Sequence, residues 1–195
     1  AMRHWFARSL AVLAIALTGA SPVPEEESRV VFVPWKMLRP GAPAPSAPLM
    51  LFWIPGSREE LRRSGLLTSE ELARYATQCV AMVVVRPDDF RTIEALGADP
   101  KRAAAILADE NGVVLARLES EAGPLPIEEV VRLVRDALDT RGAAADASLD
   151  AAKEKAASGE TAAAIAMYRK VWEQRCMCPR QGKDAQRALK KLAKR

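Results

Sequence analysis

The sequence contains a single histidine, His4, and only three cysteines among its 195 residues. His4 lies in an amino-terminal segment that we expect to be removed, so the mature chain would contain no histidine. A chain without histidine cannot use a histidine general base, a Ser-His-Asp triad or a histidine-ligated metal. These classes of site are therefore excluded for the mature chain, and no metal or cofactor is expected.

The excess of positive charge is also small. The formal net charge is +4, and two of these charges, Arg3 and Arg8, belong to the same amino-terminal segment. The remaining charge of about +2 is too low to indicate a nucleic-acid partner. Apolar residues make up 49% and charged residues 28%, which is typical of a globular protein with a hydrophobic core.

The amino terminus has the three parts of a secretory signal peptide. A short basic start precedes an apolar stretch at residues 9–17, and residues 18–20 are small enough for cleavage. The apolar stretch is shorter than the roughly 20 residues that a membrane-spanning helix needs. We therefore predict a signal peptide at residues 1–20 and a periplasmic or extracellular protein, with an uncleaved anchor as the alternative. Ser21 stands where a lipoprotein would need cysteine, which argues against a lipid anchor.

Residues 21–45 are rich in proline and polar residues, and we expect them to be largely extended. Within them, residues 29–33 form a β-branched and aromatic run that predicts an edge or lead-in strand. The proline-rich passage at residues 40–48 favours polyproline geometry over a packed element.

Residues 46–140 alternate apolar runs with helical patterns. The continuous apolar runs predict strands buried on both faces, at residues 49–54, 79–85 and 103–108. Asn111-Gly112 is a hairpin turn signal that adds an antiparallel strand at residues 113–118. The predicted helices lie at residues 57–78 in two pieces, at 88–96 and from Pro126 to about 140. This order predicts an α/β fold in which helices flank a mixed central sheet.

Two capping boxes mark the beginnings of the two pieces of the first helix. In each box a hydroxyl residue is followed three residues later by glutamate, as in Ser57 with Glu60 and Thr68 with Glu71. Gly65 separates the two pieces.

The last third of the chain is alanine- and lysine-rich. Residues 141–147 consist mostly of small residues and are predicted to be a linker, and residues 148–195 are predicted to form three helices. Gly159 and the stretch from Pro179 to Gly182 separate these helices.

The spacing of Gly159, Ala164 and Tyr168 resembles the middle of one tetratricopeptide repeat. Repeat arrays usually need about three units for stability. The extension is therefore interpreted as an ordinary helical hairpin that packs on the first domain. The alternative is a repeat-like surface for a partner or for homo-oligomerisation.

The three cysteines are Cys79, Cys176 and Cys178. In an oxidising compartment an odd number leaves at least one thiol unpaired within the chain. The structural interpretations are one buried and one exposed tail cysteine, or a bond from either tail cysteine to Cys79. The functional alternatives are a labile vicinal disulfide and a copper(I) site, which would need further ligands.

The order of elements over residues 46–140 resembles the thioredoxin family. Four motifs carry the resemblance: FWIP at the end of the first buried strand, LLTSEELARYATQ, VAMVVVRPDD and AAAILADENGVVLARL. The subgroup that they resemble has a long, split first helix and includes the carboxy-terminal domain of the periplasmic thiol:disulfide interchange protein. The resemblance implies a thioredoxin-like domain followed by a helical extension.

The redox cysteines of that family do not carry over. The resemblance places them at Ser57 and Glu60, or at Ile54 and Ser57 if the register shifts by three residues. Thioredoxin-like chemistry needs a low-pKa thiolate and a second thiol to resolve the mixed disulfide, so no catalytic residue is expected here. The family's cis-proline falls at Ala103, where a cis bond is strongly disfavoured. Ser57 and Glu60 are predicted to cap a helix, and the alternative is contact with a ligand at the helix amino end.

These observations predict a redox-inactive protein-binding or scaffold module of the bacterial cell envelope, with one surface on each part of the chain. A thiol–disulfide oxidoreductase that uses Cys176 and Cys178 is one alternative, and an accessory subunit of a larger membrane-attached complex is another. The basic residues of the segment 180–195 are expected to form a solvated face. The alternative is attraction to anionic lipid or to an acidic protein.

Overall fold

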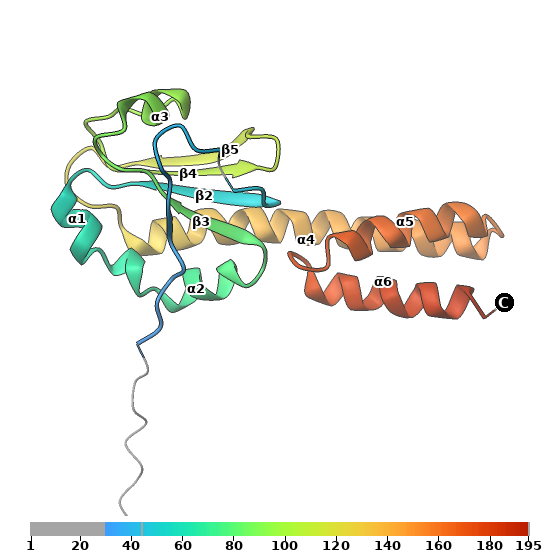
Figure 1. Ribbon diagram of the computed structural model, residues 1–195. Helices are drawn as coiled ribbons and strands as arrows, with labels where there is room; N and C mark the ends of the chain where they lie inside the picture. Colours follow the sequence, from blue (N-terminus) through green and yellow to red (C-terminus); the bar gives the residue numbers. More distant parts are fainter. Residues whose placement is uncertain (1–29, 44, 195) are drawn as a thin grey trace, which may run out of the picture.

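The chain folds into a five-stranded mixed sheet with helices on both faces and a carboxy-terminal helical region (Figure 1). This computed structural model describes residues 30–43 and 45–194. The predicted signal peptide at residues 1–20 lies outside the described residues, as does part of the predicted extended segment 21–45. The prediction of an α/β fold with a mixed central sheet is confirmed.

The strand order in the sheet is β1-β3-β2-β4-β5. The strands are β1 (Lys36–Met37), β2 (Leu49–Ile54), β3 (Val80–Val84), β4 (Ala104–Asp109) and β5 (Val114–Glu119). Strand β3 runs parallel to β1 and β2, whereas β4 runs antiparallel to β2 and β5. The three apolar runs and the hairpin strand predicted from the sequence are confirmed to within one residue at each end.

Helices cover both faces of this sheet (Figure 1). They are α1 (Arg58–Arg63), the 3₁₀ turn η1 (Gly65–Leu67), α2 (Glu70–Ala76), α3 (Phe90–Ala95), α4 (Ile127–Ala157), α5 (Thr161–Glu173) and α6 (Pro179–Leu192). Leu66, Leu72 and the apolar stripe of α4 pack on one face, and Ile93 of α3 packs on the other.

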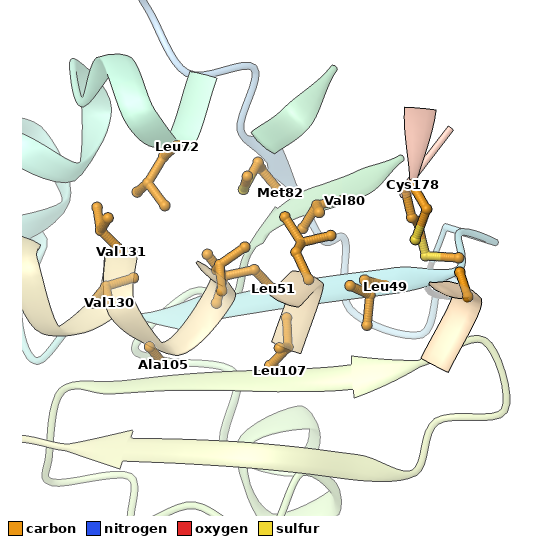
Figure 2. Close-up of a cluster of buried hydrophobic side chains, with 14 of the residues drawn as sticks. Leu49, Leu51, Leu72, Val80, Met82, Ala105, Leu107, Val130, Val131 and Cys178 are labelled. Carbon is orange, nitrogen blue, oxygen red and sulfur yellow. The ribbon is translucent and has the colours of Figure 1, made fainter. Parts of the chain in front are cut away.

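Each face of the sheet has its own hydrophobic cluster, because successive side chains of a strand point to opposite faces. On the α4 face, Leu51 and Leu107 belong to one hydrophobic cluster with Val130 and Val131 of α4 (Figure 2). All six residues of β2 are buried. This explains why the strand is a continuous apolar run rather than an alternating one.

The edge strand lies later in the chain than the sequence predicted. Residues 30–33 form no strand, and the edge strand β1 is instead Lys36–Met37. The N–H of Val33 donates to the carbonyl of Leu67 at 2.9 Å, so this run is held by the η1 turn and not by the sheet. Val33 is buried there, whereas Val30 and Phe32 are exposed.

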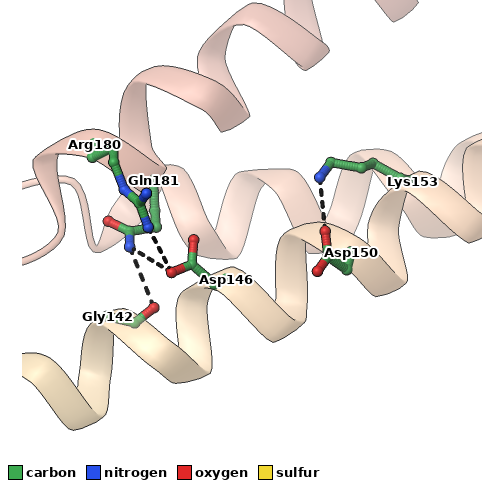
Figure 3. A network of polar contacts seen from close by, with 6 residues as sticks. All are labelled: Gly142, Asp146, Asp150, Lys153, Arg180 and Gln181. Atoms are coloured by element: carbon green, nitrogen blue, oxygen red, sulfur yellow. Dashed lines mark hydrogen bonds and ion pairs between the residues drawn. The ribbon is translucent and has the colours of Figure 1, made fainter.

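Helix α4 continues through the segment that the sequence predicted to be a linker. It has 31 residues and contains all of residues 141–147. Alanine is the best helix former and glycine costs about 1 kcal/mol relative to it, so the three alanines that follow Gly142 sustain the helix. In this segment Asp146 accepts hydrogen bonds from Arg180 and Gln181 of α6 (Figure 3). One long helix therefore joins the sheet to the carboxy-terminal helices.

The second helix cap is one residue later than predicted. Ser69, and not Thr68, caps α2, because its Oγ accepts a hydrogen bond from the N–H of Leu72. The N–H of Thr68 is used by the preceding turn, where it donates to the carbonyl of Gly65.

The carboxy-terminal region contains the predicted helices, although the break before the last one lies earlier than predicted. Gly159 adopts a φ of +86° in the turn before α5, a left-handed conformation that glycine reaches without strain. Ala164 and Tyr168 are buried within the helical region. The break before α6 falls at residues 174–178, and Pro179 is the first residue of that helix, a position at which its missing N–H costs nothing.

Candidate functional site

The turn after β2 places Ser57 and Glu60 together at the beginning of α1. The Oγ of Ser57 accepts a hydrogen bond from the N–H of Glu60 at 3.1 Å, which confirms the predicted cap. The Glu60 carboxylate reaches one residue further back than a standard capping box and accepts from the N–H of Gly56 at 2.7 Å. Its other oxygen accepts from the N–H of Leu125 at 3.4 Å. Glu60 therefore ties the turn to a loop 65 residues later.

Ala103 lies directly against this turn. A Cβ placed on Gly56 would lie 3.3 Å from the nitrogen of Ala103, so the two backbones are in close contact. All peptide bonds of the described residues, including the bond before Ala103, are trans. The structure thus brings together the three positions, Ser57, Glu60 and Ala103, that the sequence singled out.

A surface pocket of about 570 Å³ opens beside these three residues. Its walls come from α1, from the residues before β4 and from the loop that follows β5. Charged residues of both signs stand on the rim, among them Arg63, Lys101 and Glu121, while Leu125 and Ile127 supply apolar surface. None of the described residues that line the pocket is a cysteine.

The loop at residues 120–125 and the pair Lys101-Arg102 are the parts of this site that sequence reasoning missed. Gly123-Pro124 is a turn signal that indicates a loop at this place. It gives no indication that the loop folds back onto a helix cap far away in the sequence.

The cysteines of the described chain lie at the opposite end of the sheet from this pocket. Cys79 precedes Val80, which pairs with Leu49 at the start of β2, whereas Ser57 follows the end of β2. Leu49 and Ile54, the two ends of β2, are five residues apart at roughly 3.3 Å per residue, which is on the order of 16 Å along the strand. Neither Cys176 nor Cys178 is therefore placed beside Ser57.

Cys79 forms a disulfide with Cys176, in the segment between α5 and α6. Their Cα atoms are 5.8 Å apart, within the usual range for a disulfide. A bond from a tail cysteine to Cys79 was one of the structural alternatives, whereas a vicinal bond between Cys176 and Cys178 is not formed. Cys178 remains a free thiol that is only 2% exposed, and burial raises its pKa.

The described residues contain no group of three or more His, Cys, Asp or Glu residues placed to hold a metal ion. In the same part of the chain no helix is both long enough and apolar enough to cross a bilayer.

The cysteine arrangement predicts a stepwise alkylation pattern. Iodoacetamide should label none of Cys79, Cys176 and Cys178 in the native, non-reduced protein, because two are bonded and the third is a buried, protonated thiol. In denaturant without reductant it should label Cys178 alone, and after reduction it should label all three. Peptide mass spectrometry measures each step. Labelling of Cys176 in the native protein would contradict the pairing.

No protein-family model matches the chain, and neither a curated protein nor a solved structure is significantly similar to it.

Proposed function

We propose that this protein is an exported, redox-inactive member of the thioredoxin fold class that acts as a protein-binding or scaffold module in the bacterial cell envelope. The amino-terminal sequence pattern supports export. The succession of strands and helices over residues 46–140 supports the fold, as does the FWIP sequence where β2 runs into α1. The helical extension supplies a second surface.

One observation carries the proposal: the pocket at the end of β2 stands where the resemblance places a redox centre, yet its described lining contains no sulfur. The Ser57 hydroxyl and the Glu60 carboxylate are engaged with backbone N–H groups of the chain itself. They hold the shape of the pocket and are not reactive groups. A rim of mixed charge around apolar surface suits a polypeptide segment.

The absence of redox activity is tested by insulin reduction in the presence of dithiothreitol. The purified protein should reduce insulin no faster than dithiothreitol alone. A faster rate would overturn the proposal. If that rate were lost in the Cys176→Ser, Cys178→Ser variant, the activity would belong to the tail cysteines, as in the oxidoreductase alternative.

Binding at the pocket is tested by photo-crosslinking in the native envelope fraction. A benzoyl-phenylalanine at position 101, on the pocket rim, should yield a discrete crosslinked species. Ala122→Trp, which fills the pocket from its wall, should reduce that species about tenfold, the effect of losing about 1.4 kcal/mol of affinity. Ala147→Trp is the matched control on the exposed surface of α4 and should leave it unchanged. Crosslinking that is insensitive to Ala122→Trp would show that the pocket is not the binding surface.

A further inference from the structure

The two parts of the described chain, residues 30–160 and residues 161–194, have net charges of opposite sign. Residues 30–160 contain 16 basic and 20 acidic residues, a net charge of −4. Residues 161–194, which contain α5 and α6, have nine basic and only two acidic residues, a net charge of +7. The small net charge of the whole chain therefore conceals a strongly basic helical end.

Five basic residues of α6, together with Lys194 two residues beyond its end, form one stripe. At 3.6 residues per turn, all six fall within an arc of about 100° and extend for roughly 20 Å. All six are exposed: Arg180, Lys183, Arg187, Lys190, Lys191 and Lys194. The opposite side of α6 contains Ala185, Leu189 and Leu192, which pack towards the other helices.

Helix α6 is held in place, so the stripe is a fixed surface. Arg180 pairs with Asp146 of α4 at 2.7 Å, and Gln181 donates to the same carboxylate at 3.0 Å (Figure 3). Arg187 pairs with Asp184 within the helix. In the described part of the chain, Lys183, Lys190, Lys191 and Lys194 form no ion pair, so four positive charges of the stripe are uncompensated.

The stripe lacks what a protein partner would need for specific binding. Interfaces between proteins depend on a few aromatic or apolar anchors in a shaped patch. None of the large hydrophobic residues that are exposed in the described chain belongs to α5 or α6. A row of lysines without an apolar anchor suits instead a fluid surface of negative charge, which requires no complementary shape.

We propose that the basic stripe of α6 binds the headgroups of anionic phospholipids and holds the protein on a membrane surface. This inference rests on the proposed function only for the location in the cell envelope. Helix α6 and the helix α1 that borders the pocket lie at opposite ends of the molecule (Figure 1).

Vesicle co-sedimentation of the full chain tests the proposal. The protein should bind vesicles that contain about 30 mol% phosphatidylglycerol, because each basic residue near an anionic surface adds attraction. Binding should be lost when salt rises from about 0.1 M to 1 M, because the Debye length falls from about 10 Å to 3 Å. Vesicles of phosphatidylcholine alone measure any insertion of the apolar amino-terminal stretch, which does not depend on anionic lipid.

Two matched triple variants locate the binding surface. Lys183→Gln, Lys190→Gln, Lys194→Gln should weaken binding to anionic vesicles about tenfold to a hundredfold. The control changes three exposed arginines of the sheet region, which also form no ion pair among the described residues: Arg62→Gln, Arg74→Gln and Arg91→Gln. It has the same net charge and should bind as the unchanged protein does.

Equal weakening by both variants would overturn the proposal, because net charge and not the stripe would then govern binding. Failure to bind anionic vesicles, or binding to duplex DNA in place of vesicles, would also overturn it. Ala122→Trp should leave vesicle binding intact. Failure of the pocket proposal is therefore distinguishable from failure of this one.

Discussion

Replacement of both bonded cysteines, Cys79→Ser with Cys176→Ser, is expected to lower the free energy of unfolding by about 2–4 kcal/mol. The disulfide joins residues 97 apart in the sequence, and for a loop of that size the chain-entropy model gives up to about 4.7 kcal/mol. The bond also attaches the start of β3 to the segment between α5 and α6. Its loss should therefore loosen the helical end before the sheet. Urea unfolding followed by circular dichroism measures the difference.

Reductant and a glycine variant serve as controls for this effect. Reduced wild-type protein should unfold at the same urea concentration as the double variant. Adding reductant should not change the unfolding midpoint of the double variant. Cys79 has a φ of +59°, the left-handed region, where a non-glycine residue costs about 1 kcal/mol or more. Cys79→Gly with Cys176→Ser should therefore recover about 1 kcal/mol relative to the serine pair. A double variant as stable as the wild type would show that the bond contributes nothing to folding.

The parts of the fold that could be predicted are those encoded by local pattern. The runs LMLFWI and CVAMVVV predict β2 and β3 because a strand buried on both faces must be apolar throughout. The cap formed by Ser57 and Glu60 was also predictable, since both partners lie within one turn of α1. The contact of Glu60 with Leu125 was not, because nothing in either segment indicates the other.

Two local patterns were misread because one signal was given too much weight. Gly142 suggested a linker, but the alanines around it favour helix, and packing against α6 supports the helix at Ala145 and Asp146. The run at residues 29–33 has strand-like composition, yet the sheet edge is formed by the exposed pair Lys36–Met37. A strand of two residues has no periodicity that a sequence could reveal.

The cysteine pairing shows where sequence reasoning ends. Three cysteines permit three single bonds, and the choice depends on which thiols the folded chain brings within reach. The parallel pairing of β2 with β3 puts Cys79 at one end of the sheet, and the continuous helix α4 brings the α5–α6 segment to the same end. Both facts are tertiary. The sequence therefore predicted that the positions of Ser57 and Glu60 hold no thiol, but it predicted neither the pocket beside them nor the pairing of the cysteines.

Trp53→Ala is expected to cost about 3–5 kcal/mol of the free energy of unfolding, the usual range for truncation of a buried aromatic residue. Trp53 is fully buried on β2, and its ring lies 5.3 Å from that of Trp35 at an angle of 54°. Its indole N–H has no hydrogen-bond acceptor among the described residues, although the nitrogen is buried. Its stabilising contribution is therefore one of volume and apolar contact. Equilibrium unfolding followed by circular dichroism avoids the change in fluorescence.

The two tryptophans give a matched comparison that separates volume from hydrogen bonding. Trp53→Phe removes apolar volume but also a buried N–H without a partner, which costs about 1–3 kcal/mol while present. Trp35→Phe removes a donor that bonds the carbonyl of buried Leu66 at 2.8 Å and leaves that carbonyl unpaired. Trp35→Phe should therefore be at least as destabilising as Trp53→Phe, although Trp35 is only half-buried. If Trp53→Phe instead lowered the free energy of unfolding by over about 1 kcal/mol more than Trp35→Phe, the Trp53 N–H would have a hydrogen-bond partner. A net hydrogen bond contributes about that much.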